Sequence, residues 1–242
     1  MRVAILTDIH ANLPALEATL EAIDAAGVEE RWCLGDVVGY GAQPDECARL
    51  VRERCDLCLV GNHDLAVAGE IDTEVFSASA AAAVEWTREN ADAETLGFLR
   101  GLRPEDQSRA VGLYHASPRD PVWEYVLSLD QALECMREQE HDVSLIGHSH
   151  VALYFGEGDG GPVGGQAPAD HRLELSKGRW LVNPGSVGQP RDGDPRAAWL
   201  ELDLESKEAV YRRADYEIDR AAEAIRAAGL PAMLADRLYI GQ

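Results

Sequence analysis

The sequence lacks any long apolar run near its beginning. The first such run, Val3 to Leu6, is cut short by Asp8. A signal peptide or a membrane-spanning helix needs a much longer apolar stretch. We therefore expect neither here, expect no membrane partner, and expect a cytoplasmic protein.

Lysine is also nearly absent, because Lys177 and Lys207 are the only two. The chain has 22 basic against 43 acidic residues, which gives a net charge of −21. So acidic a surface repels phosphate backbones. Polymeric DNA or RNA is therefore not an expected partner unless a cation mediates the contact.

The five cysteines do not form a pattern typical of disulfides. Their number is odd and no export signal accompanies them, which excludes a disulfide framework. Cys55 and Cys58 form a C-x-x-C, which could be half a zinc site or a redox pair, but no second C-x-x-C accompanies it. We interpret all five as buried, inert thiols; they are Cys33, Cys47, Cys55, Cys58 and Cys135.

The first part of the chain alternates strands and helices. Residues 2–7, 31–35 and 56–61 are short apolar runs typical of strands. Between them, Leu13, Leu16, Leu20 and Ile23 keep helical spacing, and residues 44–54 predict a second helix. This β-α-β-α-β order implies parallel strands with functional residues at their carboxyl ends.

The later part changes character. An alanine-rich helical stretch covers about residues 74–101. Residues 109–115 and 142–148 are then expected to be two more strands of the first sheet, with a helix at about 129–140 between them. Five short strands with turns between them then predict a second, antiparallel sheet. The glycine-rich segment 156–166 is expected to be a disordered hairpin tip, and a helix of about 217–237 closes the chain. An apolar share of 46% and a length of 242 residues suit one domain, residues 1–242.

Polar side chains follow the predicted strands at the points where they end. Taken singly, each group has an ordinary explanation: a helix cap at "TDIH", a turn at "LGD", or an exposed loop at "GHSH". Five of the seven histidines nevertheless fall in these groups, and only His141 and His171 do not. The grouped residues are Asp8, His10, Asp36, Asn62, His63, His115, His148 and His150.

Apart from His63, these groups supply two aspartates, one asparagine and four histidines. Carboxylate oxygen and imidazole nitrogen are ligands that Mn, Fe, Co, Ni and Zn accept. Seven ligands are too many for one ion, and they suit two divalent ions that share one carboxylate. Manganese is the ion that we expect first.

The order of these motifs resembles the calcineurin-like metallophosphoesterases. The pattern is D-x-H, G-D-x-x-G, G-N-H-D, a lone histidine and G-H-x-H, and "VNPGSVG" (182–188) resembles the loop after the last motif in small bacterial and archaeal members. The resemblance extends over nearly the whole chain. It implies an α+β fold, a four-layer α/β/β/α sandwich with two mixed sheets and a two-metal centre.

The resemblance also implies roles for individual residues. Asp8, His10 and His150 would bind the first metal, Asn62, His115 and His148 the second, and Asp36 would bridge them. His63 would bind no metal and would act as an acid or stabilise the phosphoryl group, while a metal-bridging hydroxide attacks phosphorus. The expected reaction is hydrolysis of a small phosphorylated substrate, with His63 and Asp36 as catalytic residues.

One departure from the family pattern narrows the expected substrate. Phosphoprotein phosphatases of this superfamily have G-D-x-V-D-R-G, whereas this chain has Gly39 and Tyr40 at the second Asp and the Arg. We therefore expect a small phosphodiester or nucleotide-type substrate. A phosphomonoesterase, a dinucleoside polyphosphate hydrolase and a non-catalytic protein-binding scaffold of the same fold are the alternatives. The sequence indicates no oligomeric state.

Two segments are expected to control substrate choice. The helical insert of about residues 70–105 could be a lid or a plain amphipathic pair covering the sheet. Residues 117–126 follow His115, so Arg119, Trp123 and Tyr125 could contact a base or sugar, although Trp123 could instead pack against the insert. The expected substrate contacts are Tyr40, Asn62, His63, Arg119, Trp123 and Tyr125.

Overall fold

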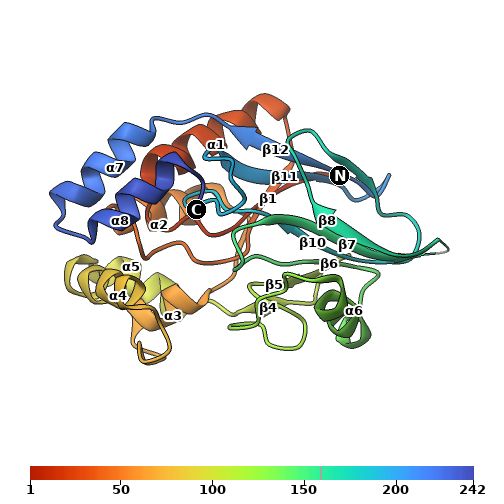
Figure 1. Ribbon diagram of the computed structural model, residues 1–242, viewed down its shortest axis with the longest axis horizontal. Coiled ribbons are helices and arrows are strands. Elements are labelled where there is room, and N and C mark those ends of the chain that lie inside the picture. The colour runs from red at the N-terminus through yellow and green to blue at the C-terminus, as the bar shows by residue number, and fades with distance from the viewer. Residues whose placement is uncertain (159) are drawn as a thin grey trace.

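The computed structural model describes residues 1–158 and 160–242. Two six-stranded mixed sheets stack on each other, with helices on both outer sides (Figure 1). The helices are α1 (Leu13–Ala26), α2 (Pro44–Arg54), α3 (Asn62–Ala68), α4 (Ala78–Asn90), α5 (Ala93–Arg100), α6 (Leu129–Glu138), α7 (Ile218–Ala227), α8 (Ala232–Asp236) and the 3₁₀ turn η1 (Arg237–Tyr239). The described helices include none that is long and apolar enough to cross a membrane.

The first sheet contains the expected β-α-β-α-β unit. Its strand order is β3 (Leu57–Cys58), β2 (Glu30–Cys33), β1 (Arg2–Leu6), β11 (Ala197–Asp203), β12 (Glu208–Ala214) and β9 (Arg172–Glu174). β1, β2 and β3 are parallel, as predicted, and β11 pairs antiparallel with the free edge of β1.

The second sheet has the order β4 (Glu105–Asp106), β5 (Gly112–Tyr114), β6 (Val143–Leu145), β10 (Arg179–Pro184), β7 (Ala152–Gly158) and β8 (Gly161–Gln166). The sequence placed β5 and β6 in the first sheet, and this prediction was wrong. β6 pairs in parallel with β10 instead, so each sheet combines early and late strands. Alternation of apolar residues indicates a strand but not its partner, because the period is the same in either sheet.

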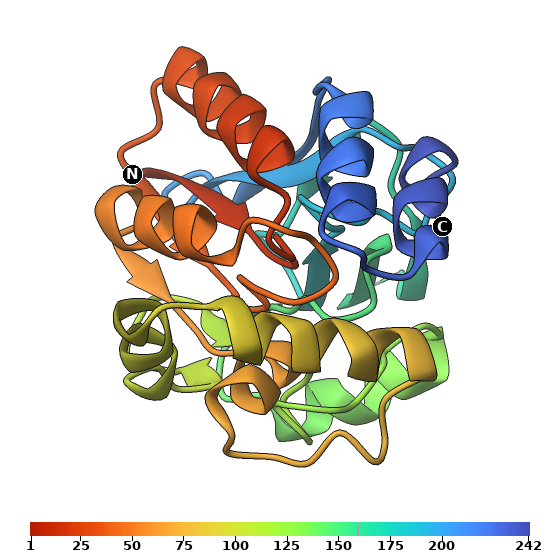
Figure 2. The same ribbon diagram turned by 90° about the vertical axis from the view of Figure 1, so that its left-hand side faces the viewer.

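Apolar residues fill the space between the sheets and the space under the outer helices. Ile5 and Leu200 of the first sheet and Leu145 of the second lie in the buried cluster between them. α1 packs on β11 and β12 with α7 beside it (Figure 2), while α6 packs on β10, β7 and β8. Figure 2 shows α1, α2, α7 and α8 in the upper half of the molecule and α3 to α6 in the lower half. The expected four-layer α/β/β/α sandwich is confirmed.

Two predicted segments differ from the structure. The closing helix is interrupted between α7 and α8, where Gly229 has a φ of +72° and Pro231 follows. Glycine in the left-handed region with a proline behind it is a strong helix stop. The glycine-rich segment expected to be disordered instead supplies β8, which pairs with β7 from Leu153 to Gly158. Asp159 of this segment lies outside the described residues.

The cysteines are all free thiols. Cys33, Cys47 and Cys135 are buried, and Cys55 and Cys58 are half-buried. Burial raises the pKa of the Cys47 and Cys135 thiols, that of Cys135 to about 12. A thiol protonated at neutral pH is a poor nucleophile and a poor metal ligand, which agrees with the inert role expected for both.

Candidate metal centre

The polar residues singled out in the sequence converge at one end of the sandwich. Asp8 and His10 follow β1, Asp36 follows β2, and Asn62 opens α3, all in or beside the first sheet. From the second sheet, His115 follows β5, and His148 and His150 follow β6. All seven are buried, with 4% of their surface or less exposed. The parallel strands of both sheets therefore present their carboxyl ends to the same place.

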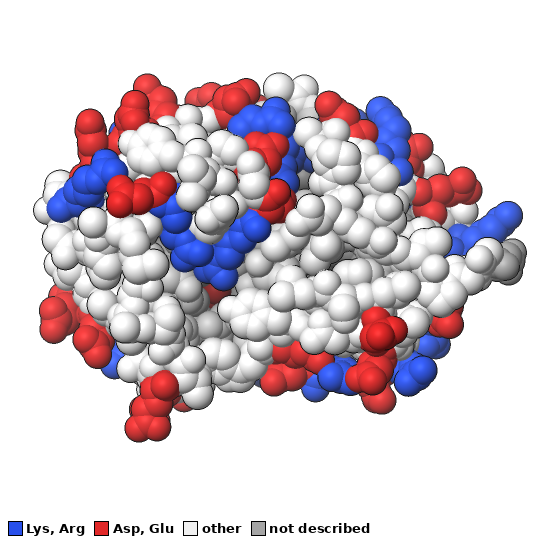
Figure 3. Space-filling model, viewed as in Figure 1, with Lys and Arg blue, Asp and Glu red and all other residues white. Residues whose placement is uncertain are grey.

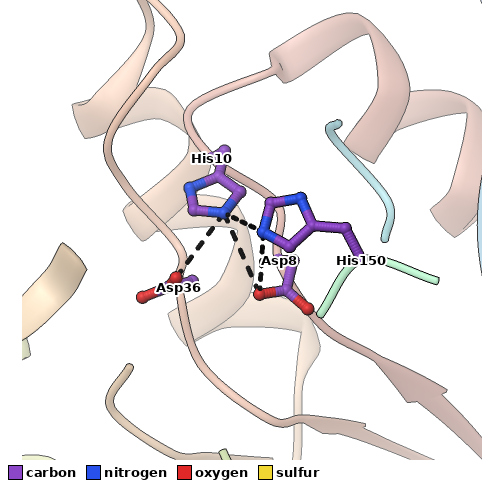
Figure 4. Close-up of side chains that lie close together, drawn as sticks. All are labelled: Asp8, His10, Asp36 and His150. Carbon is purple, nitrogen blue, oxygen red and sulfur yellow. Dashed lines mark hydrogen bonds and ion pairs between the residues drawn. The ribbon is translucent and has the colours of Figure 1, made fainter. Parts of the chain in front are cut away.

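These side chains form two groups that have Asp36 in common. The possible ligand atoms of Asp8, His10, Asp36 and His150 all lie within 4.8 Å of one another. The same holds for a second group, Asp36, His115 and His148. Asn62 adjoins the second group, because its Oδ1 lies 3.2 Å from Nε2 of His115. Figure 4 shows the rings of His10 and His150 facing each other beside the two carboxylates.

Each carboxylate has one oxygen fixed by the protein and one that is left free. Oδ2 of Asp8 accepts hydrogen bonds from the Thr7 hydroxyl at 2.9 Å and the His148 N–H at 3.0 Å. Oδ1 of Asp36 accepts one from the His63 N–H at 2.9 Å. The remaining oxygens, Oδ1 of Asp8 and Oδ2 of Asp36, are buried without a hydrogen-bond partner among the described residues. Unpaired buried oxygens are costly, so these two atoms fit a bound cation as their partner.

The free oxygen of Asp36 lies between the two groups of imidazoles. It is 3.5 Å from Nε2 of His10 in the first group and 3.7 Å from Nε2 of His115 in the second. The free oxygen of Asp8 lies 3.5 Å from Nε2 of His150. The carboxylate of Asp36 is therefore positioned to serve both groups at once.

Hydrogen bonds to backbone carbonyls fix the tautomers of the histidines. Nδ1 of His10, His115 and His150 lies within 3.0 Å of the carbonyl oxygens of Val38, Leu34 and Gln189, respectively. A carbonyl only accepts, so each Nδ1 carries the proton and each Nε2 presents a lone pair. His148 is reversed, because its Nε2 donates to the Trp123 carbonyl at 3.2 Å and leaves Nδ1 free.

Two of these lone pairs face each other directly. Nε2 of His10 and Nε2 of His150 are 3.0 Å apart, although neither atom carries a proton to share. Lone pairs at this distance repel unless a cation lies beside them. The donor set of carboxylate oxygens and imidazole nitrogens is the set that borderline divalent metals accept, so the residues present fit such ions.

Burial shifts the titration of these groups toward their neutral forms. It raises the pKa of Asp8 to about 7 and raises the pKa of Asp36 well above its usual value. Burial also lowers the pKa of His10, His148 and His150 well below 6.5, so these imidazoles are neutral at pH 7. Neutral imidazole is the form that binds a metal, whereas each carboxyl must first lose its proton.

The backbone is strained where it carries these side chains. Asp8, His10, Asp36, His148 and His150 all have left-handed φ values of 51° to 64°. That conformation costs a non-glycine residue about 1–3 kcal/mol and is maintained only by the surrounding structure. Asp64 provides part of that support, since its carboxylate accepts hydrogen bonds from the N–H groups of Val37, Val38 and Gly61 at 3.0–3.2 Å.

Glycines allow the loops to approach one another closely. A Cβ added to Gly61 would lie 2.1 Å from Oδ1 of Asp36. A Cβ added to Gly39 would lie 2.5 Å from Nδ1 of His63. Gly39 occupies the position where phosphoprotein phosphatases have the second Asp of their motif, so this chain leaves no room for such a side chain.

His63 stands beside the two groups and belongs to neither. Its ring lies 4.9 Å from that of His10, 4.4 Å from that of Tyr40 and 4.9 Å from that of Phe76. Its Nδ1 is buried without a partner among the described residues. Burial, and then the charge of Arg191, lower the pKa of His63 well below 6.5.

An open cavity of about 450 Å³ lies in front of His63. Of the residues expected to contact a substrate, Tyr40, Asn62, His63, Trp123 and Tyr125 line it, and Arg119 does not. Arg119 instead forms ion pairs with Glu124 and Glu134. Trp123 also packs against the insert, with its ring 5.3 Å from that of Phe76, which was the simpler of the two roles considered for it.

Sequence reasoning missed two arginines, Arg191 and Arg237, which line the same cavity. Arg191 follows the "VNPGSVG" loop by three residues, and that proximity was the available signal. Arg237 lies in η1 and has no motif around it. His141 and His171 lie outside both groups, as the sequence predicted, since His141 bonds the Gln107 carbonyl and His171 stacks on Tyr154.

The raised pKa of Asp8 predicts a pH-dependent metal affinity. Below about pH 7 a bound Mn²⁺ must displace the carboxyl proton, so the apparent affinity should fall by up to about tenfold per pH unit for each proton displaced. Above that pH the contribution of Asp8 should level off. Calorimetric titration across this range measures how steeply the affinity for Mn²⁺ changes with pH.

Asp8→Asn should reduce this pH dependence. Asp130→Asn, at an exposed position of α6, should not reduce it. An affinity independent of pH below 7 would contradict this electrostatic description.

Comparisons with known proteins agree with this geometry. A model of the calcineurin-like phosphoesterase superfamily domain matches residues 1–207. An uncharacterized protein of Methanocaldococcus jannaschii is 35% identical, over 99% of this chain and 98% of that protein. The crystal structure of a metallophosphoesterase from Sphaerobacter thermophilus is similar at a TM-score of 0.90 and 38% identity, covering 100% of this chain and 99% of that chain.

A hypothetical protein from Pyrococcus horikoshii shares the fold at a TM-score of 0.81 and 20% identity, over 100% of this chain and 98% of that chain. The family model covers all the motifs that carried the resemblance, from Asp8 to the loop after His150. The chain belongs to the calcineurin-like phosphoesterase superfamily.

Proposed function

We propose that this protein is a two-metal phosphoesterase that hydrolyses a small phosphodiester or nucleotide-type substrate. The observation that carries the proposal is the free carboxylate oxygen of Asp36, which lies within 3.7 Å of an imidazole nitrogen from each group. One carboxylate shared between two sets of ligands is the arrangement that two-metal hydrolases use.

The proposed ligands follow the two groups of side chains. Asp8, His10 and His150 would hold the first ion, Asn62, His115 and His148 would hold the second, and Asp36 would serve both. Mn²⁺ is the proposed ion, and Fe, Ni, Co and Zn are accepted by the same donors. When bound, the two ions supply the positive charge that makes water nucleophilic at neutral pH and neutralises the phosphoryl oxygens.

His63 acts on the substrate and does not bind a metal. Its side chain lines the cavity, and it is neutral in the free protein because burial lowers its pKa. A negatively charged phosphoryl group beside it would favour the protonated ring. His63 then stabilises a phosphoryl oxygen or protonates the leaving alkoxide, a contribution of about 10²–10⁴-fold in typical enzymes.

Two features favour a small diester over a phosphoprotein. The cavity of about 450 Å³ suits a small molecule. Gly39 and Tyr40 also replace the Asp and Arg of the protein phosphatase motif. The segment before α4 contributes Val75 and Phe76 to one wall of the cavity. We propose that the insert of about residues 70–105 acts as a lid over this cavity. The insert is part of the one proposed domain, residues 1–242.

Removal of metal should abolish activity. A chelator should stop hydrolysis of bis(4-nitrophenyl) phosphate because the attacking water is then no longer activated, and Mn²⁺ should restore it. Elemental analysis of the active protein should find about two transition-metal ions per chain. Full activity in a sample verified to be free of metal would end the two-metal proposal.

Alanine substitutions at the adjacent residues Asn62 and His63 should reduce activity for different reasons. Asn62→Ala should weaken metal binding, and high Mn²⁺ should recover part of the rate. His63→Ala should keep both ions and lose about 10²–10⁴-fold in rate, with no rescue by added metal. His141→Ala is the matched control, because His141 lies away from the cavity and should be replaceable with little kinetic effect.

The choice of leaving group separates the two roles of His63. A 4-nitrophenyl group departs without a proton, so its ester should suffer less from His63→Ala than an alkyl or ribosyl ester does. Equal losses would assign His63 to the phosphoryl oxygens. Loss of metal from the His63→Ala protein would instead make His63 a ligand or a structural residue and remove the acid from the mechanism.

A further inference from the structure

The cavity in front of the metal centre is basic, although the chain has a net charge of −21. Arg191 and Arg237 line it, and none of the lining residues is an aspartate or glutamate. Figure 3 shows a group of basic side chains on this face, beside the hollow between the upper and lower halves of the molecule. The acidic surface is thus interrupted at the place where a substrate would enter.

Arg191 is held by the loop that orients a proposed metal ligand. Its N–H donates to the His150 carbonyl at 3.0 Å, and the ring of His150 bonds the carbonyl of Gln189 at 2.8 Å. The Arg191 side chain donates to Oε1 of Gln189 at 2.8 Å and lies over the ring of Tyr40, 5.6 Å from its centre. The Tyr40 ring also contacts His63, because the two ring centres are 4.4 Å apart.

Arg237 reaches the cavity from a segment that the family model does not cover. That model ends at residue 207, whereas Arg237 lies in η1. Its Nε donates to the main-chain oxygen of Gln242. The turn that follows is joined to the Arg191 loop, because the N–H of Gly193 donates to the Gly241 carbonyl at 3.0 Å. Two segments distant in sequence therefore contribute arginines to the same cavity.

The two guanidinium groups have no carboxylate side chain as a partner among the described residues. Among the described residues, neither Arg191 nor Arg237 forms an ion pair with an aspartate or glutamate side chain, whereas Arg226, in the same C-terminal segment, pairs with Asp236 at 2.7 Å. Burial, and then the charge of Arg191, lower the pKa of Arg237. Two half-buried like charges in one cavity are costly, and a bound anion would offset that cost.

Aromatic side chains form another part of the cavity wall, beside small and aliphatic residues. The Phe76, Trp123 and Tyr125 side chains line it, and the Tyr125 ring lies 4.0 Å from that of His148. Tyr125 and Val75 are 44% and 72% exposed, so both are accessible to a molecule that enters the cavity. An aromatic wall beside a cationic one suits a molecule that carries both a flat ring and a negative charge.

We propose that Arg191 and Arg237 bind a second phosphate group of the substrate, separate from the one that is hydrolysed. This inference rests on the proposed phosphoesterase function and specifies its substrate as a molecule with two phosphate groups. The lining of the cavity carries it, because Arg191 and Arg237 contribute two cationic side chains beside His63, no described aspartate or glutamate lines the cavity, and neither arginine belongs to the two groups of proposed ligands.

A pair of substrates that differ by one phosphate tests the proposal. Thymidine 5′-(4-nitrophenyl phosphate) and its 3′-phosphorylated analogue release the same chromophore from the same ester. The wild-type protein should prefer the 3′-phosphorylated compound by about tenfold or more in kcat/KM, the effect of about one charge-assisted contact. Arg191→Gln and Arg237→Gln should each reduce that preference, and the double variant should bring it close to one.

Matched measurements separate this proposal from the proposed function. Arg226→Gln removes an equal charge from the same segment and should keep the preference. Calorimetry with thymidine 3′,5′-bisphosphate and thymidine 5′-monophosphate, measured without turnover, should give the same ratio of affinities as the kinetics. Tighter binding of the bisphosphate that is lost in Arg237→Gln, in a protein that hydrolyses neither ester, would support the second phosphate site and contradict the phosphoesterase.

Three results would overturn the inference. Equal kcat/KM values and equal affinities for the paired compounds in the wild-type protein would show that no second phosphate is bound. A preference that survives in the Arg191→Gln, Arg237→Gln double variant would place the second phosphate elsewhere. An equal loss for both substrates in the variants would assign the arginines to the phosphate that is hydrolysed.

Discussion

The free oxygen of Asp36 is the constraint on which the rest of the site depends. It is buried without a hydrogen-bond partner among the described residues, although burial of a bare carboxylate oxygen is costly. It lies 3.5 Å and 3.7 Å from the Nε2 atoms of His10 and His115, which come from opposite sheets. The stacking of the two sheets is therefore what creates the site, and a cation shared across them would offset the cost of burying it.

The local structure around Asp36 serves this arrangement. Left-handed backbone at five of the grouped side chains turns them inward from the ends of the strands, and Gly61 leaves room for the Asp36 carboxylate. The Asp64 carboxylate ties together the loops after β2 and β3. Strain of this kind persists only where the surrounding packing outweighs it, and the buried clusters between and outside the sheets supply that packing.

Much of the site was predictable because strand ends are visible in sequence. Parallel strands present their carboxyl ends together, so the polar residues after each apolar run could be grouped before any contact was known. The sheet to which β5 and β6 belong was not predictable, because the spacing of apolar residues does not indicate which strand pairs with which. Arg119 was favoured by its nearness to His115 in sequence, but it does not line the cavity. Arg191 and Arg237 were missed because loop packing alone brings them there. The break at Gly229 and Pro231 could have been read directly from the sequence.

Crystals grown with Mn²⁺ and measured near the manganese absorption edge would test the central claim most directly. The account predicts two anomalous peaks about 3.5–4 Å apart, one among Asp8, His10 and His150 and one among Asn62, His115 and His148. Both peaks should lie within bonding distance of the Asp36 carboxylate. A single peak in a fully loaded crystal, or two peaks of which only one touches Asp36, would contradict the account.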